Sequence, residues 1–211
     1  MTGVDSAGER PLIAVLDYGI GNLRSAQKAL ERMGADARLT ADHRLVADAA
    51  GVVLPGVGAF GACIHALHKA GLADDAIEAA GSARPFLGVC VGMQLLYEGS
   101  EESPGVPGLG VLPGKIQLLP DGVKRPQMQW NRLAVRRSST LLDGLGDEPW
   151  MYFVHSYVAA DGPEVVATCD YGGPATALVE QGNVAACQFH PEKSGANGLG
   201  LLANFVAQLR Q

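Results

Sequence analysis

Short apolar runs alternate with helical patterns through the first half of the chain, and this rhythm constrains the fold most. The runs have the length of buried strands, and the segments between them carry apolar residues at helical spacing. Strands separated by helices form parallel sheets covered on both faces. The strand-like runs are residues 12–16, 51–54 and 86–89, and the helical patterns are residues 22–33, 63–69, 72–80 and the segment after Cys90.

From Gly105 onward, Gly/Pro turns separate short strand-like segments, which is typical of antiparallel pairing. A closing helix is predicted over residues 200–209. The sequence therefore predicts an α/β fold, with a mostly parallel central sheet flanked by helices and an added antiparallel layer. The later strand-like segments are residues 115–119, 132–135, 151–159, 165–169, 177–180 and 184–189.

The composition is that of a globular protein, with 47% hydrophobic and 18% charged residues in 211 positions. Residues 1–10 are polar and lack the apolar region of a signal peptide, so we expect a flexible tail there and a single domain over residues 11–211. No apolar run approaches the ~18 residues of a membrane span. A net charge of −6 argues against nucleic acid as the main ligand.

The four cysteines have no C-x-x-C spacing, and no cluster of His, Asp and Glu suggests a metal. The sequence therefore predicts no metal and no cofactor. A chain of this size does not need disulfides for stability, which favours a reducing cytoplasm as its location.

Cys90 lies between a strand-like run and a helical run, with Gly88 and Gly92 two residues away on either side. Gly-x-Cys-x-Gly is the thiol counterpart of the nucleophile elbow of hydrolases. A thiolate at such a turn faces the positive end of the helix dipole, which favours the nucleophilic form. A buried cysteine in a core turn is the alternative.

His190 falls at the end of a strand-like run and is followed two positions later by Glu192. Residues i and i+2 of an extended chain point to the same side, so the two side chains should project together, with Pro191 stiffening the backbone. A carboxylate beside an imidazole fixes its tautomer and stabilises the imidazolium. Cys90, His190 and Glu192 are thus predicted to form a Cys-His-Glu triad.

A Gly/Pro turn follows the second apolar run and reads Leu-Pro-Gly-Val-Gly-Ala-Phe-Gly over residues 54–61. On its own it is more often an ordinary strand-to-helix turn, because Gly/Pro clusters are common, but such a loop can also aim backbone N–H groups at an oxyanion. For the second case we choose the N–H groups of Val57 and Val91.

Gln94 comes one helical turn after Cys90, so its amide either faces the thiol pocket or faces solvent. Glu102 is either part of a solvated acidic turn or a receptor for the ammonium group of an amino acid. His155 is the other candidate general base. The residue two positions after it is Tyr157, whereas the residue two positions after His190 is Glu192. His155 therefore lacks an orienting carboxylate nearby in the chain, and we expect it to be structural or to line the substrate site. Trp130 lies in a polar, Pro-flanked segment interpreted as a loop, either packed in the core or exposed as an interface anchor.

Four motifs together resemble a known family. They are Leu-Pro-Gly-Val-Gly-Ala-Phe-Gly, Gly-Val-Cys-Val-Gly-Met-Gln, Phe-Val-His-Ser-Tyr and Gln-Phe-His-Pro-Glu-Lys. In this order they are similar to class I (triad-type) glutamine amidotransferases. The motifs Asp-Tyr-Gly-Ile-Gly-Asn and Met-x-Trp-Asn narrow the resemblance to the glutaminase subunit of imidazole glycerol phosphate synthase, from about Leu12 to the C-terminus. One departure is Gln129, in a motif where the family often has glycine.

The resemblance implies a flavodoxin-like fold and assigns roles to matching positions. Catalysis would use Cys90, His190 and Glu192, and the oxyanion hole would use Val57 and Val91. Substrate-binding positions would be Gly56, Gly58, Gln94, Glu102, His155, Ser156 and Tyr157. Positions facing the partner would be Asn22, Trp130, Tyr152 and Lys193.

The implied reaction is hydrolysis of L-glutamine to L-glutamate and ammonia. The chain has no second catalytic domain to use the ammonia, and the resemblance implies that its heterodimer partner is a separate (βα)8-barrel cyclase. It also implies low activity without that partner, with the turn at residues 55–58 rearranging to point the Val57 N–H inward.

Three alternatives remain open at this stage. The chain could be a glutaminase that serves another synthase, such as those for anthranilate or pyridoxal phosphate. It could be a non-catalytic amidotransferase-like module, although such proteins typically lose the cysteine or histidine that is present here. A secreted cysteine protease is the third.

Overall fold

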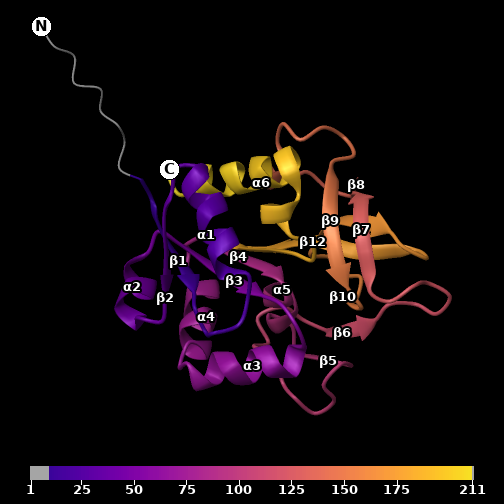
Figure 1. Ribbon diagram of the computed structural model, residues 1–211, viewed down its shortest axis with the longest axis horizontal. Helices are drawn as coiled ribbons and strands as arrows, with labels where there is room; N and C mark the ends of the chain where they lie inside the picture. The colour runs from indigo at the N-terminus through magenta and orange to yellow at the C-terminus, as the bar shows by residue number, and fades with distance from the viewer. Residues whose placement is uncertain (1–9, 211) are drawn as a thin grey trace, which may run out of the picture.

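An eight-stranded sheet runs through the molecule and brings distant parts of the chain together (Figure 1). The computed structural model describes residues 10–210, so the predicted tail lies outside the described residues except for Arg10. The strand order is β2 (Asp36–Thr40), β1 (Leu12–Leu16), β3 (Gly51–Gly56), β4 (Phe86–Cys90), β13 (Val184–Cys187), β12 (Pro174–Gln181), β11 (Val165–Asp170) and β8 (Ala134–Val135).

The sheet is parallel from β2 to β13 and antiparallel from β13 to β8. The predicted fold class is therefore confirmed. Antiparallel strands continue the main sheet, and the described residues also form two smaller sheets. In one, β6 (Lys115–Leu118) pairs antiparallel with β10 (Tyr157–Ala159) and parallel with β5 (Gly99–Ser100). In the other, β7 (Gln127–Arg132) pairs antiparallel with β9 (Trp150–His155).

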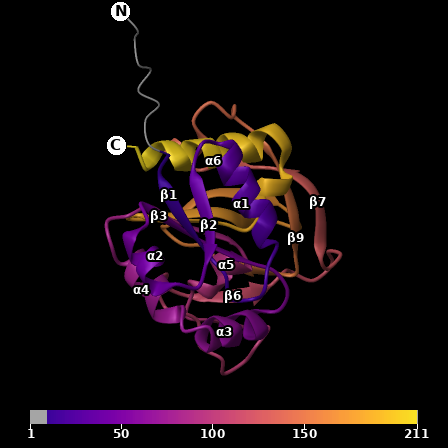
Figure 2. The same ribbon diagram turned by 60° about the vertical axis from the view of Figure 1, so that its left-hand side comes forward.

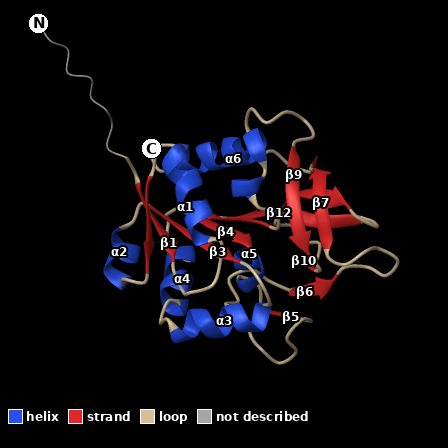
Figure 3. Cartoon of the chain, in the orientation of Figure 1, coloured by secondary structure: helices blue, strands red, loops and turns tan. Residues whose placement is uncertain are grey.

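Helices cover both faces of the sheet, as Figures 1 and 2 show. On one side α1 packs against α6, and on the other α3 contacts α4 and α5 while α2 contacts α4. Figure 3 shows the helices gathered around the parallel half and the smaller sheets at the opposite end. The helices are α1 (Leu23–Arg32), α2 (His43–Asp48), α3 (Phe60–Lys69), α4 (Ala73–Ala80), α5 (Val91–Leu95), α6 (Gly195–Gln208) and the 3₁₀ turns η1 (Thr140–Leu142) and η2 (Pro191–Lys193).

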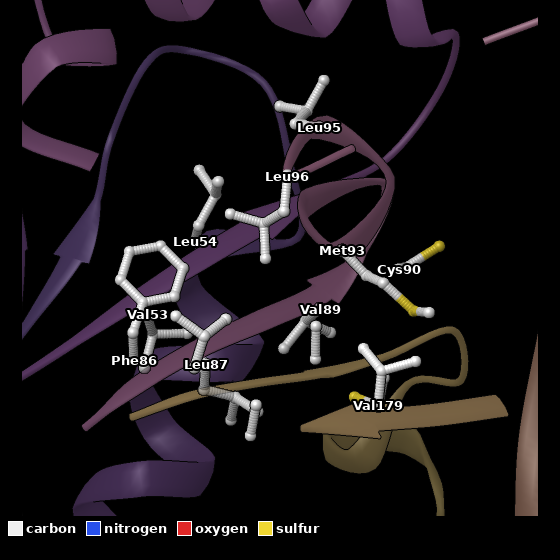
Figure 4. Packing of buried hydrophobic residues seen from close by; sticks show 14 of the residues in the cluster. Val53, Leu54, Phe86, Leu87, Val89, Cys90, Met93, Leu95, Leu96 and Val179 are labelled. Carbon is white, nitrogen blue, oxygen red and sulfur yellow. The ribbon is translucent and has the colours of Figure 1, made fainter. Parts of the chain in front are cut away.

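Buried aliphatic and aromatic side chains from the central strands form the core. Figure 4 shows Leu54 of β3, together with Phe86 and Leu87 of β4, beside Leu96 just after α5. All four side chains are fully buried. Burial of each is worth about 1.5–3 kcal/mol, which makes β4 a rigid support for the residue at its end, Cys90.

The amino-terminal half contains two elements that were not predicted from the sequence. Strand β2 reads Asp-Ala-Arg-Leu-Thr and is an edge strand paired only with β1 among the described strands. An edge strand needs no continuous apolar run, so its pattern resembles that of a loop. The short helix α2 follows it, with Asp42 as N-cap accepting a hydrogen bond from Arg44 N.

Strand β3 is longer than predicted and includes Pro55 and Gly56. Proline has no N–H to give to a sheet. Its position is tolerated because β1 pairs with β3 only through Val53, so beyond that point β3 has β4 alone as its neighbour.

Three predictions in the second half were wrong. The Trp130 segment is strand β7 and not a loop, since its backbone pairs with β9 although most of its side chains are exposed. The predicted strand over residues 132–135 is split at buried Leu133, so Arg132 ends β7 and β8 begins after it. The predicted strand 151–159 likewise breaks at Ser156 into β9 and β10, which belong to different sheets.

Helix α6 begins five residues before the predicted start, at Gly195. Its first turns contain Asn and several glycines, which are weak helix formers, so the sequence pattern did not indicate that the helix begins there. Gly198 has a packing reason, because a Cβ there would stand 2.0 Å from Pro191 O of η2. The prediction of one domain over residues 11–211 stays a prediction.

Candidate active site

Cys90 occupies a strained turn at the carboxyl end of β4. Its backbone has φ 55° and ψ −112°, and it is the only non-glycine residue with positive φ among residues 10–210. Such dihedrals are costly for a residue with a Cβ and concentrate at functional sites. Cys90 is also the residue that precedes the first turn of α5, as an elbow requires.

The glycines around Cys90 are needed because backbone segments touch there. A Cβ on Gly92 would lie 1.8 Å from Leu54 O, and one on Gly56 would lie 2.7 Å from Gly92 N. A Cβ on Gly88 would meet Leu96 Cδ1 at 3.0 Å. Thus β3 and α5 press against each other directly beside the thiol.

Gly92→Ala is expected to destabilise the fold by about 3 kcal/mol or more, because backbone must move to admit the methyl group. Urea unfolding of the variant measures the loss. Gly81→Ala is the matched control, since Gly81 has φ −81° and a Cβ there meets Ile77 O at an ordinary 3.4 Å. Equal stability of the two variants would contradict the packing argument.

His190 is brought beside Cys90 by strand pairing. Strand β13 runs parallel to β4 with Cys187 opposite Val89, so the chain leaves both strands at the same edge of the sheet. His190 follows three residues after β13 ends. Its backbone N–H donates to Tyr152 O at 3.0 Å, and Ser194 Oγ donates to its carbonyl at 2.6 Å. The imidazole is therefore held on a fixed backbone.

His190 Nδ1 lies 2.9 Å from Glu192 Oε1, and both side chains are at least 96% buried. The expectation that extended backbone would align them was wrong. Residues Pro191–Lys193 form the 3₁₀ turn η2, with Pro191 in its first turn, and this turn brings the carboxylate back to the ring. The contact between His190 and Glu192 therefore depends on a 3₁₀ turn, whereas the sequence had suggested an extended strand.

The surroundings of His190 favour its protonated form. Burial on its own lowers the pKa of His190, but hydrogen bonding and negative charge from Cys90 and Glu192 raise it to about 9. At neutral pH the ring is therefore an imidazolium beside the Cys90 side chain. This pairing of thiol, imidazole and carboxylate is the arrangement of a covalent hydrolase with an acid/base group.

A cavity of about 540 Å³ opens beside the thiol at the carboxyl ends of the strands. Open α/β sheets bind ligands at this edge. The cavity gathers most of the predicted site residues. Its lining consists of Gly21, Asn22, Val57, Gly58, Cys90, Val91, Gln94, Glu102, Pro126, Val154, His155, Ser156, Tyr157, His190 and Lys193.

Four of the predicted residues do not line this cavity. Gly56 is the last residue of β3, Glu192 lies in η2 beside His190, and Trp130 and Tyr152 belong to the β7–β9 sheet. A larger cavity of about 710 Å³ lies at the amino ends of β1 and β2 beside Arg10, Arg38 and Arg210. It has no cysteine or histidine in its lining, so the chemistry belongs to the cavity at Cys90.

Gln94 is buried, and the solvent-facing alternative is wrong. Its Nε2 donates to Tyr157 O at 3.1 Å and to Gln188 Oε1 at 3.0 Å. Gln188 Nε2 in turn lies 3.8 Å from Cys90 Sγ. No role was predicted for Gln188, although it stands in the Gln-Phe-His-Pro-Glu-Lys motif. The two amides connect α5, β10 and the thiol.

Glu102 has a structural contact as well as a place in the cavity. Its Oε2 accepts from Phe60 N, at the first residue of α3, at 2.7 Å. A carboxylate at a helix N-terminus is stabilised by the unpaired N–H groups there. Glu101 points elsewhere and accepts from Leu118 N at 2.9 Å. Of these two glutamates, Glu102 lines the cavity and Glu101 does not.

His155 differs from His190 in protonation. Burial lowers the pKa of His155 to about 4, with repulsion from His190 adding to the effect and a hydrogen bond to Tyr157 O opposing it. That bond joins Nδ1 to Tyr157 O at 2.9 Å, so Nδ1 carries the proton of the neutral ring. A ring that stays neutral is a poor acid, which leaves His190 as the better acid/base group.

Of the four residues predicted to face a partner, two line the cavity and two lie on the β7–β9 sheet. Asn22 and Lys193 line the cavity, and Trp130 stacks edge-on against Tyr152 with ring centroids 6.0 Å apart. Trp130 is 47% exposed, so core packing is excluded for it. Met128 and Trp150 are also exposed on this two-stranded sheet, which forms an apolar face beside the site.

The described part of the chain contains no group of three His, Cys, Asp or Glu side chains arranged to hold a metal ion. It also contains no helix with the length and apolar content needed to cross a bilayer. Gly21, Pro126 and Val154 line the cavity without having been predicted. Gly21 lies in the Asp-Tyr-Gly-Ile-Gly-Asn motif, which could have pointed to it, whereas no sequence pattern marked Pro126 or Val154.

Comparison with known proteins agrees with this geometry. Residues 14–209 match the family model described as glutamine amidotransferase class-I. The chain belongs to this family. Solved structures show the same fold: a protein described as glutamine amidotransferase has a TM-score of 0.73 at 24% identity, covering 94% of this chain and 98% of that one. The structure of PurLQS from Thermotoga maritima has a TM-score of 0.71 at 23% identity, covering 95% of this chain and all of that one.

Curated relatives are more similar in sequence. Imidazole glycerol phosphate synthase subunit HisH of Methanothermobacter thermautotrophicus is 48% identical over 200 residues, covering 94% of this chain and all of that protein. The subunit HisH of Deinococcus radiodurans is 48% identical over 203 residues, covering 94% of each chain. The narrower resemblance to this subunit family, seen in the motifs, is therefore confirmed.

Proposed function

We propose that this chain is the glutaminase subunit of imidazole glycerol phosphate synthase in histidine biosynthesis. In this function it hydrolyses L-glutamine to L-glutamate and ammonia and passes the ammonia to a separate (βα)8-barrel cyclase subunit. The observation that carries the proposal is a buried cluster in which Cys90 and His190 line one cavity and Glu192 contacts His190 Nδ1. We place the reaction in the cytoplasm, because all four cysteines of the chain are buried and free.

The proposed chemistry begins with the Cys90 thiolate attacking the side-chain amide carbon of glutamine. His190 is an imidazolium at neutral pH, so it can give a proton to the departing nitrogen as the tetrahedral intermediate collapses. Ammonia leaves and a thioester remains. The now neutral His190 takes a proton from water, the hydroxide cleaves the thioester, and glutamate and the thiolate are released.

Glu192 has a supporting part in the proposed reaction. Since its Oε1 faces His190 Nδ1, it keeps the proton on that nitrogen and turns Nε2 toward the thiol. Oxyanion stabilisation by N–H groups of Val57 and Val91 remains part of the proposal, supported by the place of both residues in the cavity lining. Rearrangement of the turn at residues 55–58 on partner binding is also proposed.

The substrate fits the charge pattern of the cavity. Glu102 offers a carboxylate to the ammonium group of an amino acid, and Lys193 adds a cationic side chain to the lining. Neutral groups line the same cavity, namely Gly58, Gln94 and the segment His155-Ser156-Tyr157. We assign these residues to glutamine binding.

The test is glutamine turnover by the purified chain with and without the cyclase of the same organism. We expect glutamate release to be slow for the chain alone and to rise when the cyclase and its nucleotide substrate are added. Anthranilate and pyridoxal phosphate synthase subunits serve as partner controls. Turnover that responds to one of those subunits and not to the cyclase would contradict the proposed pathway.

Trp130→Ala is expected to weaken binding of the cyclase by about 10-fold or more, because exposed aromatic residues commonly anchor interfaces. Isothermal titration of the two subunits measures the change. Ile77→Ala is the matched control, since Ile77 is similarly exposed at 42% but lies on α4, away from the β7–β9 sheet. If both variants bind equally well, Trp130 is not part of the interface.

A further inference from the structure

Two buried side chains hold the Gly/Pro turn of the active site from behind. The Tyr18 hydroxyl donates to Pro55 O at 2.7 Å, and the Cys63 thiol donates to Val57 O at 3.2 Å. Tyr18 follows β1 and Cys63 lies on α3, and both are almost completely buried. Neither residue lines the cavity, whereas Val57 does.

Both donors keep their protons at neutral pH. Burial raises the pKa of Tyr18 and of Cys63, and negative charge on the nearby Cys90 raises both further. The two groups also interact with each other. Together they form a protonated pair beneath the turn, close enough to the nucleophile to feel its charge.

The hydrogen bonds fix the direction of two peptide groups. In a trans peptide the C=O and the N–H of the same peptide group point in opposite directions. When the carbonyl of such a group points toward Cys63 or Tyr18, its N–H therefore points away from that side chain. The fixed groups are Pro55–Gly56 and Val57–Gly58. Between them lies the Gly56–Val57 peptide, which carries the Val57 N–H assigned to the oxyanion hole.

The turn is tightly packed at Gly56, between α5 and the Tyr18 side chain. A Cβ at that position would stand 2.7 Å from Gly92 N and 2.8 Å from the Tyr18 hydroxyl oxygen. The backbone is thus confined between α5 and Tyr18. Gly58, by contrast, has φ +93° and nothing within 4 Å of a Cβ, so the turn is crowded at its first glycine and open at its second.

We propose that Tyr18 and Cys63 are positioning residues that keep the carbonyls of Pro55 and Val57 out of the cavity. This inference rests on the proposed function and deepens it. A carbonyl oxygen that faced the developing oxyanion would repel it, whereas N–H groups stabilise it. The pair therefore acts on the rate of the chemical step without touching glutamine.

The expected result is a selective loss of kcat. Tyr18→Phe and Cys63→Ala each remove one hydrogen bond to the turn, and each should lower kcat about three- to ten-fold in the complex with the cyclase. The KM for glutamine should change less than about two-fold, because neither side chain lines the cavity. Cys63→Ser keeps a donor at the same place and should restore most of the kcat.

Cys169→Ala is the matched control, since Cys169 is equally buried but lies on β11 and contacts Gln127. Like Cys63→Ala, the Cys169→Ala variant removes one buried sulfur atom, but its kcat should be unchanged. A second readout is alkylation of Cys90 by iodoacetamide, followed by mass spectrometry. Its rate should be unchanged in Cys63→Ala, because the triad stays intact.

Two results would overturn the inference: an unchanged kcat in both Tyr18→Phe and Cys63→Ala, or an equal loss of kcat in Cys169→Ala. A Cys63→Ser variant as slow as Cys63→Ala would also contradict it. Failure of the unaltered complex to hydrolyse glutamine contradicts the proposed function itself, so the two failures are distinguishable.

Discussion

Cys90→Ala is expected to reduce glutamine hydrolysis by at least about 10⁴-fold, because the variant has no nucleophile to form the thioester. Any hydrolysis that remains in the variant would depend only on how the cavity positions glutamine and water. Release of glutamate by the chain and its cyclase complex measures the effect. The truncation should cost little stability, since the thiol stands in a strained turn and its loss leaves the flanking glycine contacts intact.

The matched controls for Cys90→Ala test binding and folding separately. Synthesis with added ammonium salt bypasses the glutaminase, so the complex of this variant should still work with ammonium as nitrogen source. Cys169→Ala should hydrolyse glutamine normally. A Cys90→Ala complex that still uses glutamine would indicate a non-catalytic module and would refute the proposed chemistry.

Glu192→Gln is expected to lower kcat by about 10²–10⁴-fold, the range seen when the orienting carboxylate of a triad is replaced by an amide. The amide keeps the size of the side chain but loses the charge that favours the imidazolium. The amide can also rotate and offer N–H₂ to Nδ1, which would favour the other tautomer. Steady-state kinetics with the cyclase complex measures the loss, and the KM for glutamine should change little.

The pH profile of Glu192→Gln provides an independent check. In the unaltered chain His190 has a pKa of about 9, so it keeps its proton at neutral pH and loses it as the pH rises through that value. Glu192 is one of the groups that raise this pKa, so its replacement moves deprotonation to lower pH. The alkaline limb of kcat/KM should therefore shift toward acid. A limb that stays in place would mean that Glu192 does not act on His190.

Catalytic groups were easier to predict than the backbone that carries them. Cys90 was predicted from the two glycines around it, and the structure gives each glycine a steric reason. His190 and Glu192 were paired correctly in space, but on the assumption of an extended chain. Sequence spacing of two is compatible with both a strand and a 3₁₀ turn, and only the contacts of η2 with α6 decide between them.

The antiparallel part of the fold was harder to predict because its strands are exposed or interrupted. β7 has a buried residue only at one end, so apolar alternation, the main sequence sign of a strand, is absent. The break at Ser156 assigns β9 and β10 to different sheets, which a continuous apolar run cannot reveal.

Contacts between segments far apart in the chain were also not predicted from the sequence. Gln188 touches Cys90 across 98 positions of the chain, and Tyr18 reaches the turn across 37 positions. Each belongs to a quoted motif, but a motif gives no direction for a side chain. Cys63 had no motif at all and was interpreted only as part of a helix, so its bond to Val57 O depends on the packing of α3 alone.

The pairing of β4 with β13 has a consequence for which changes this protein tolerates. The last paired rung of that ladder joins Val89 to Cys187, one residue before Cys90 and three residues before His190, so hydrogen bonds between peptides bring both residues to the same edge of the sheet. Insertions in the surface loops between residues 91 and 183 leave that ladder untouched. Removal of a single residue within β4 would turn Cys90 to the opposite face of the sheet.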